Sequence, residues 1–235
     1  ELLAKMVSRL EAEQAAGNTP LFKESSWVER CQEWKAKYPV VQKKHYEDTK
    51  HTNVYAFIKE LSSRLSEGQV TVVGNGSACV VGSHAYVIKK GQRFIINSAI
   101  ASMGYDLPAA IGIWAASRKD GAYSMGAARE GEDVILITGD GSIQMNLQEL
   151  QTIIHHRMGI KIFVINNGGY HFIRQTQKNF FGEPLIGIGV DSGDLSFPAL
   201  DKLAAAYGYP YVSARHNSEL GEAVEKTLAA EGPAI

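Results

Sequence analysis

The spacing of the hydrophobic residues changes along the chain and predicts its secondary structure. From residue 52 onward, short continuous apolar runs alternate with segments whose apolar residues recur every three or four positions. Continuous apolar runs between helices are typical of parallel strands that are buried on both faces. The expected strands are 70–73, 94–96, 134–138, 160–165 and 211–213, and the expected helices are 54–66, 107–117, 147–156, 198–207 and 218–230. The sequence therefore predicts an α/β fold of three αβα layers with a mostly parallel central sheet.

Residues 1–50 have a different pattern. The first twelve residues fit the end of an amphipathic helix, a polar glycine- and proline-containing stretch follows, and a short helix is expected around 26–37. Trp27 and Trp34 are expected to pin this helix to a neighbouring surface. We interpret residues 1–50 as the end of a preceding central domain with a linker helix, and 51–235 as the C-terminal domain. The chain begins without a methionine, and its apolar last residues are expected to start a buried strand. Both features suggest a piece of a longer polypeptide.

Composition narrows the functional classes. The chain has 235 residues, of which 45% are hydrophobic and 21% charged, and its formal net charge is −1. This balance gives no electrostatic support for binding nucleic acid. No apolar run reaches the roughly 20 residues that cross a bilayer. Cys31 and Cys79 are the only cysteines and lie far apart, which favours free thiols in a reducing compartment. We therefore expect a cytoplasmic protein with neither a nucleic-acid nor a membrane partner.

Two polar motifs follow neighbouring expected strands. Residues 139–142 (Gly-Asp-Gly-Ser) follow one strand and Asn166-Asn167 follows the next. One crossover helix joins these strands, so both motifs lie at the carboxyl edge of the sheet, where open α/β sheets bind ligands. Asp140, Asn167 and the main-chain carbonyl of Gly169 offer three oxygen ligands. Two diphosphate oxygens and a water would complete the octahedron that Mg²⁺ requires. Ser142 and the N–H groups after it lie at a helix entry, which suits phosphate.

Each motif alone has a simpler interpretation. Gly-Asp-Gly is commonly only a turn, and Asn-Asn-Gly-Gly is commonly only a loop. Their joint occurrence at the ends of two strands favours a binding site. Asn146 and Glu149 fit a helix capping pair and are given that structural role alone. His155 and His156 close a helix, where a positive charge suits the helix dipole, and are given no catalytic role.

The same motifs carry a resemblance to a known family. Gly-Asp-Gly, then about 25 residues, then Asn-Asn resembles the thiamine-diphosphate enzymes. Residues 139–170 (GDGSIQMNLQELQTIIHHRMGIKIFVINNGGY) and 101–116 (ASMGYDLPAAIGIWAA) are similar to the acetolactate synthase and pyruvate decarboxylase branch. The resemblance extends from about residue 70 to residue 233. It implies the thiamine-diphosphate-binding fold and the catalytic, large-subunit type of acetolactate synthase.

The resemblance implies roles for individual residues. Asp140, Asn167 and the carbonyl of Gly169 would hold magnesium. Met103, which alone would be interpreted as core filler, would lie under the cofactor and force its two rings into a V. The carbonyl of Ala101 would accept a hydrogen bond from the 4′-amine of the cofactor. The other implied cofactor-binding residues are Asn75, Gly76, Ser77 and Ala78 after the first strand, Gly139, Gly141 and Ser142 after the third, and Tyr170 and His171.

A reaction and an assembly are also implied by the resemblance. The cofactor would add to the carbonyl of a pyruvate-like 2-oxo acid, and after decarboxylation the enamine would be ligated to a second carbonyl compound. This is a transferase reaction of branched-chain amino acid biosynthesis. The family's activating glutamate lies in an N-terminal pyrimidine-binding domain of a partner subunit, and nothing in this sequence matches that domain. We therefore expect a homodimer or homotetramer, and an isolated chain that is inactive.

Departures from the family pattern leave alternatives open. Ile173 stands where the family's decarboxylases carry a glutamate, which favours carboligation. Residues 76–79 (Gly-Ser-Ala-Cys) replace the Gly-Gln-His-Gln of typical acetolactate synthases. The leading alternative is therefore a related lyase or decarboxylase that uses another 2-oxo acid or a sugar-derived acceptor, as in polysaccharide biosynthesis. A nucleotide-binding module is disfavoured because no G-x-G-x-x-G with a following acidic residue occurs. The intact magnesium ligands disfavour a non-catalytic relative. His84 and Arg174 could approach a substrate but are expected at the surface.

Overall fold

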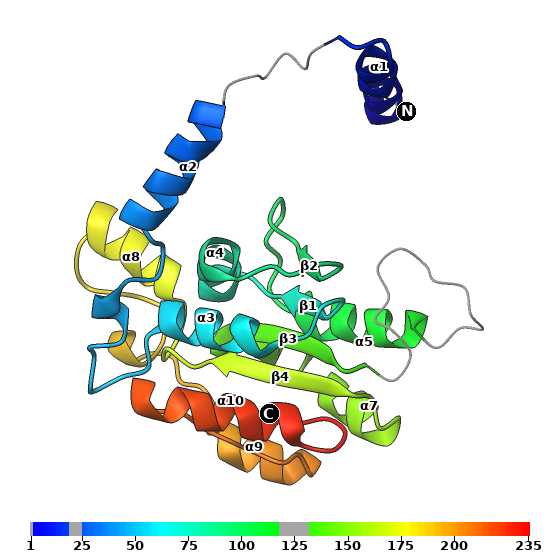
Figure 1. The fold of residues 1–235 in the computed structure, drawn as a ribbon. Helices are drawn as coiled ribbons and strands as arrows, with labels where there is room; N and C mark the ends of the chain where they lie inside the picture. Colours follow the sequence, from blue (N-terminus) through cyan, green and yellow to red (C-terminus); the bar gives the residue numbers. More distant parts are fainter. Residues whose placement is uncertain (1, 19–24, 118–131) are drawn as a thin grey trace. The chain divides into compact units, whose positions relative to one another are not determined.

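The structure is a computed structural model that describes residues 2–18, 25–117 and 132–235. It separates into two compact units, residues 1–40 and 41–235. The first unit contains helices α1 (Leu2–Ala15) and α2 (Ser25–Lys37), so both helices expected there are present (Figure 1). Trp27 and Trp34 lie one above the other on α2 and contact each other edge to face, with ring centroids 5.8 Å apart. Their docking on a neighbouring surface stays a prediction.

The described part of the second unit contains one four-stranded parallel sheet. Its strands are β1 (Val70–Val73), β2 (Arg93–Ile96), β3 (Val134–Gly139) and β4 (Ile160–Ile165). Their spatial order is β2-β1-β3-β4, and the register aligns Val73 of β1 with Ile96 of β2 and with Ile137 of β3. The strands of the central sheet were thus predicted to within a residue, and the parallel α/β class is confirmed.

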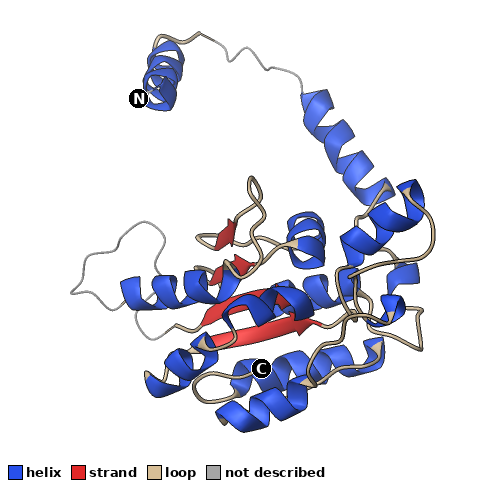
Figure 2. Ribbon diagram, turned by 180° about the vertical axis from the view of Figure 1, so that it is seen from behind, coloured by secondary structure: helices blue, strands red, loops and turns tan. Residues whose placement is uncertain are grey.

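Helices cover both faces of this sheet (Figures 1 and 2). The described helices of this unit are α3 (Val54–Arg64), α4 (Gly76–Ala85), α5 (Asp106–Ala116), α6 (Asp140–Ile143), α7 (Glu149–His155), α8 (His171–Phe180), α9 (Leu200–Tyr207) and α10 (Leu220–Ala229), with 3-10 turns at Lys43–His45, Gln144–Asn146, Val190–Ser192 and Asn217–Glu219. Residues from α3, α4 and α10 share one hydrophobic core, and residues from α5, α7 and α9 share a second. The three-layer arrangement is therefore confirmed.

Alternation along the strands explains the two cores. Successive side chains of a strand point to opposite faces, so Leu136 of β3 packs in the core with α5 and α7, while Ile137 packs in the core with α3 and α4. Both side chains are fully buried. Burial of one such side chain contributes about 1.5–3 kcal/mol to the free energy of unfolding. Two buried faces require continuous apolar runs, which is the pattern that predicted these strands.

Two helices near the carboxyl edge of the sheet are absent from the prediction. Helix α4 has apolar or small residues on most of its faces, so it gives no clear helical period. Helix α8 is amphipathic, with Phe172, Ile173 and Phe180 among polar residues, but the segment is short, polar on average and without a buried residue, so it was not recognised as a core-facing helix. Among the described helices, none combines the length and the apolar character needed to cross a bilayer.

Two local predictions are wrong. Residues 211–213 are irregular rather than a strand. Val212 N does donate to Ile235 O at 2.9 Å, but the C-terminal residues form no strand with which 211–213 could pair, since Ala234 makes only an isolated bridge to Lys161. Asn146 does not cap a helix with Glu149. Helix α7 has Gln148 at its N-cap and no side-chain cap, and Asn146 Nδ2 instead donates to Gly104 O at 2.6 Å. This contact between distant segments is invisible to local sequence patterns.

Candidate functional site

An open pocket lies at the carboxyl edge of the sheet. The sheet order places β1 beside β3, and the chain leaves these strands toward opposite edges, so the pocket occupies the topological switch point where such sheets bind ligands. Its lining comes from the segments after β1, β3 and β4 together with Met103. The lining residues are Asn75, Gly76, Ser77, Ala78, Met103, Gly139, Asp140, Gly141, Ser142, Ile165, Asn167, Gly169, Tyr170, His171, Phe172 and Ile173.

The structure brings together nearly all the site residues predicted from the sequence. Every one of them lines this pocket except Ala101. Ala101 lies beside it, because Asn75 Nδ2 donates to Ala101 O at 3.2 Å. Ala101 has a left-handed backbone with φ of 54°, which is unusual for a residue other than glycine and turns its carbonyl sharply relative to the chain.

Asp140 is the buried charge of the pocket, with only 3% of the residue exposed. Gly141 N donates to its Oδ1 at 2.8 Å, and Gly168 N and Gly169 N donate to its Oδ2 at 2.8 and 3.0 Å. Burial raises the pKa of Asp140 above its ordinary value, and these backbone N–H groups oppose the rise only in part. Within the described residues Asp140 has no side-chain cation as a partner, so its charge is desolvated and only partly compensated.

The oxygen atoms around Asp140 fit a hard divalent cation. Asn167 Nδ2 is directed toward Ser77 Oγ at 3.5 Å, so the amide oxygen is the atom that can face an ion. The carbonyl of Gly169 accepts His171 N at 3.1 Å and retains a second lone pair. No group of three or more histidine, cysteine or acidic side chains suited to a metal occurs in the described ranges. The donor set is one carboxylate plus neutral oxygens, as Mg²⁺ prefers when phosphate supplies further ligands.

Two helix entries face the pocket and suit phosphate. Helix α4 begins at Gly76, whose φ of 60° allows the sharp turn out of β1 that a side chain would hinder. The single-turn helix α6 begins at Asp140, directly after β3. Backbone N–H groups at helix entries are natural anion ligands. The hydroxyl of Ser142 is engaged, because Gly104 N donates to Ser142 Oγ at 3.0 Å, so Ser142 also fixes the segment that carries Met103.

Tyr170 closes the turn against the floor of the pocket. Its ring packs directly on Gly141, where an added Cβ would come within 2.3 Å of the ring. Apolar side chains of Ile165, Phe172 and Ile173 complete the wall. Of these three, only Ile173 was considered in the sequence, because of its position relative to the Asn-Asn motif. Phe172 was missed as a pocket residue because helix α8, which carries it, was not predicted.

A second buried carboxylate beneath the pocket was missed. Asp106 is fully buried at the start of α5, accepts a hydrogen bond from Thr138 Oγ1, and also accepts Leu107 N at 3.1 Å. A Cβ on Gly74 would come within 2.5 Å of Asp106 Oδ2, so glycine is required there. Asp106 thus ties α5 to the ends of β1 and β3. An acidic residue in an otherwise apolar helix was the available clue.

Arg174 corrects a prediction. It was expected at the surface, but its side chain is only 14% exposed and its Nε lies 2.9 Å from Asp191 Oδ2. His84 is exposed as expected. Neither residue lines the pocket.

Comparison with known proteins agrees with this geometry. The sequence model described as "Thiamine pyrophosphate enzyme, C-terminal TPP binding domain" matches residues 74–235, which is more than half of the chain. The chain belongs to the thiamine pyrophosphate enzyme family. Thiamine pyrophosphate (TPP) is the same compound as thiamine diphosphate. The predicted family resemblance is confirmed, and the pocket of this thiamine pyrophosphate enzyme domain lies within the matched residues.

Several acetolactate synthases are similar to this chain. It is 29% identical over 240 residues to the acetolactate synthase large subunit of Cyanidium caldarium, with 100% of this chain and 36% of that protein covered. It is 29% identical over 229 residues to the acetolactate synthase isozyme 3 large subunit of Escherichia coli (strain K12), with 97% of this chain and 36% of that protein covered. The acetolactate synthase of Arthrospira platensis is 32% identical over 144 residues, covering 61% of this chain and 22% of that protein.

The extent of these matches limits what they establish. The chain spans about a third of the length of the first two relatives. It contains a C-terminal TPP-binding domain and is similar in sequence to the large subunits named above.

Proposed function

We propose that this chain is the thiamine-diphosphate- and Mg²⁺-binding part of a carboligating transferase. The enzyme decarboxylates a pyruvate-like 2-oxo acid and joins the remaining acyl unit to a second carbonyl compound. The observation that carries the proposal is the buried Asp140 carboxylate in a pocket that also contains Asn167, Gly169 and two helix entries. The relatives named acetolactate synthase support the same reaction class.

The chain's own groups divide the work of binding. Asp140, Asn167 and the carbonyl of Gly169 would hold Mg²⁺, and the N–H groups at the starts of α4 and α6 would bind the diphosphate. Met103 would support the rings, and Ala101 O would accept the amine of the pyrimidine. Bound thiamine diphosphate supplies an acyl-anion equivalent, which is the chemistry that decarboxylation and carbon–carbon bond formation require.

The wall of the pocket bears on the type of reaction. Phe172 and Ile173 are apolar, so they exclude water and cannot donate a proton to the reacting carbon. His171 also lines the pocket and could hold a proton there. Without a carboxylic acid at position 173, protonation is slower and a second carbonyl compound has time to react. This wall therefore favours ligation over release of an aldehyde.

Product analysis tests the reaction type. The complete protein, given pyruvate and carbonyl acceptors, is expected to form a ligated product detected by NMR. Ile173→Glu places an acid at the pocket and should shift the products toward aldehyde. Ile88→Glu introduces the same charge at an exposed isoleucine outside the pocket lining and should leave the product ratio unchanged. Rapid acetaldehyde release by the unmodified protein, with no ligated product, would contradict the proposal and favour a decarboxylase.

A second candidate has its own support. Ser77 and Ala78 are small, line the pocket, and leave room that larger side chains would fill. A related lyase that accepts another 2-oxo acid or a sugar-derived aldehyde would use this room. Ligation observed only with such substrates, and absent with pyruvate, would establish this candidate instead.

Assembly is part of the proposal. The activating glutamate would come from the N-terminal domain of a partner subunit, so the working enzyme would be a homodimer or homotetramer in the cytoplasm, and this chain alone would be inactive. The apolar segment 102–116 is the proposed contact. Light scattering of the complete protein at assay concentration should give at least a dimer. An active monomer would contradict this assembly.

A further inference from the structure

A loop of residues 186–194 lies against the Asn-Asn-Gly-Gly turn that borders the pocket. Gly169 and Gly189 form an antiparallel bridge between turn and loop. Two backbone hydrogen bonds flank it, from Tyr170 N to Ile188 O at 2.8 Å and from Val190 N to Gly168 O at 3.2 Å. An added Cβ would lie 2.0 Å from Ile188 O if placed on Gly169, and 2.1 Å from Gly168 O if placed on Gly189. The two backbones thus touch at a distance that only glycine permits.

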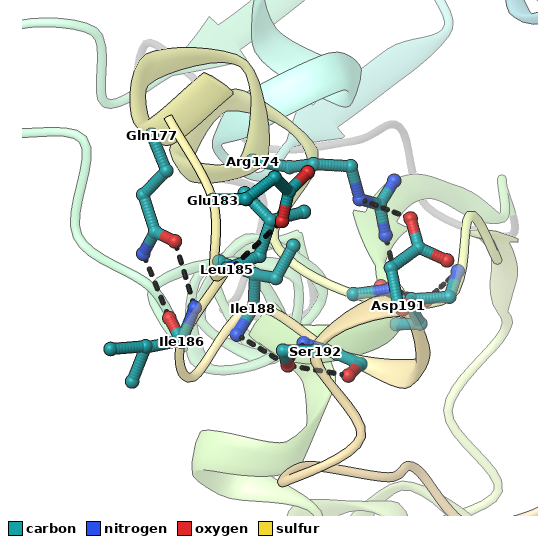
Figure 3. A network of polar contacts seen from close by, with 12 residues as sticks. Arg174, Gln177, Glu183, Leu185, Ile186, Ile188, Asp191 and Ser192 are labelled. Carbon is teal, nitrogen blue, oxygen red and sulfur yellow. Dashed lines mark hydrogen bonds and ion pairs between the residues drawn. The ribbon is translucent and has the colours of Figure 1, made fainter. Parts of the chain in front are cut away.

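The loop has its own internal polar network (Figure 3). Gln177 of α8 makes two hydrogen bonds to the backbone of Ile186, donating from Nε2 to the carbonyl at 2.7 Å and accepting the N–H at 2.9 Å. Ser192 Oγ accepts the N–H groups of Ile188 and Gly189, each at 3.2 Å. These bonds fix the loop to α8 and fix its turn. The loop therefore has a defined conformation and is held against α8 by these hydrogen bonds.

Arg174 joins helix, loop and turn. Its Nε lies 2.9 Å from Asp191 Oδ2 on the loop, and its Nη2 donates to Gly168 O at 3.3 Å on the turn. Figure 3 shows Arg174 and Asp191 facing each other across the network. A planar guanidinium can make both contacts at once, which a lysine ammonium cannot reproduce. Because Arg174 is mostly buried and does not line the pocket, its donors serve the protein rather than a substrate.

The opposite side of the same turn is held by Asp140. Gly168 N and Gly169 N both donate to Asp140 Oδ2. The peptide groups of the turn are therefore fixed from the outside by Arg174 and from the inside by Asp140. A shift of the turn would move the Gly169 carbonyl and remove two hydrogen bonds from the Asp140 carboxylate.

We propose that the Arg174–Asp191 ion pair is a brace that positions the Gly168–Gly169 turn, and with it the Gly169 carbonyl and the Asp140 carboxylate, for binding the divalent cation. Arg174 and Asp191 are positioning residues that touch neither the ion nor the substrate. The inference rests on the proposed function, because it concerns the cation of that site. Groups that orient metal ligands typically alter metal affinity about 10- to 100-fold when they are removed.

Binding of Mn²⁺ by the complete protein tests the brace. Mn²⁺ takes the same octahedral oxygen sites as Mg²⁺, and its binding can be followed by electron paramagnetic resonance with thiamine diphosphate in excess. Arg174→Gln should weaken Mn²⁺ binding about 10- to 100-fold. Asp191→Asn should weaken it less, because Arg174 keeps its bond to Gly168 O. The double variant should be no weaker than Arg174→Gln alone, because both changes break one contact. Lys178→Gln removes the same charge from an exposed position of α8 and should bind like the parent.

The outcomes separate the brace from the proposed function. Arg174→Gln that is folded and binds Mn²⁺ as the parent does would overturn the brace, as would an equal loss in Lys178→Gln. If Arg174→Gln does not fold, Asp191→Asn decides, and unchanged Mn²⁺ affinity in that variant overturns the brace. A fall in melting temperature with no change in Mn²⁺ affinity would mean that the pair only stabilises the fold. A parent that shows no Mn²⁺ binding dependent on thiamine diphosphate would overturn the proposed function itself.

Discussion

Two buried charges lie near opposite ends of the sheet, and their partners differ. Lys161, at the beginning of β4, is fully buried, but its Nζ lies 3.3 Å from Asp133 Oδ2 and donates to the carbonyls of Ala230 and Gly232. Asp140, at the end of β3, is almost as deeply buried and is met only by backbone N–H groups among the described residues. One charge is balanced by a counter-charge and the other is not.

The difference separates a structural charge from a binding charge. A buried charge costs several kcal/mol unless it is paired, and Lys161 has its pair, so it stabilises the contact between β4 and the C-terminal residues. Asp140 remains without a counter-charge, and burial raises the pKa of its carboxyl. A bound divalent cation would supply the missing charge. We therefore attribute Lys161 to folding and Asp140 to ligand binding.

The largest effect is expected from Asp140→Ala. Among the described residues Asp140 is the only charged ligand of the proposed cation site, so its removal should lower magnesium-dependent affinity for thiamine diphosphate more than about 100-fold, since even groups behind the ligands change affinity 10- to 100-fold. Calorimetry of the complete protein with thiamine diphosphate and Mg²⁺ measures this directly. Asp201→Ala, on the exposed first turn of α9, is the control and should bind like the parent. Equal affinity of Asp140→Ala and the parent would place the site elsewhere.

Lys161→Met should act on stability alone. The variant leaves Asp133 without its partner and two carbonyls without a donor, so the free energy of unfolding should fall by roughly 2–4 kcal/mol. Urea denaturation measures it. Lys226→Met removes a lysine from an exposed ion pair with Glu222 and should cost no more than about 0.5 kcal/mol. If folded Lys161→Met lost cofactor affinity as Asp140→Ala does, the division between the two charges would be wrong.

Tyr209→Phe removes one neutral buried hydrogen bond and is the reference against which the loss of stability in Lys161→Met is compared. The Tyr209 hydroxyl donates to Leu150 O at 2.8 Å in the core with α7 and α9, and burial raises the pKa of this phenol. Loss of one neutral hydrogen bond should lower the free energy of unfolding by about 1 kcal/mol. Tyr211→Phe, at a more exposed tyrosine, should stay within about 0.5 kcal/mol of the parent. A loss at Tyr209 as large as that at Lys161 would show that charge is not what distinguishes Lys161.

The sequence was sufficient wherever a local pattern reflects a buried face. Val134–Gly139 and Ile160–Ile165 were predicted because a strand buried on both faces must be apolar throughout. The motifs after these strands could be placed at one edge because parallel strands end on the same side. Helix α4 was missed because it has no clean apolar stripe, and the short amphipathic helix α8 was missed because it is polar on average and buries no residue. The assignment of 211–213 as a strand failed because its pairing depends on Ile235.

The amino-acid sequence by itself determined the fold class and the place of the site. Periodicity is a local property of the chain, and the chemistry of Asp140 and Asn167 is a property of their side chains. Tertiary structure alone decided which charges are balanced. From the sequence, Arg174 could be either a surface residue or a substrate-binding residue. In the structure it contacts Asp191 and Gly168 O, which shows that it is neither. The roles of Asp106 and Lys161 were also decided by tertiary structure, because the residues that contact each of these charged side chains come from distant segments of the chain.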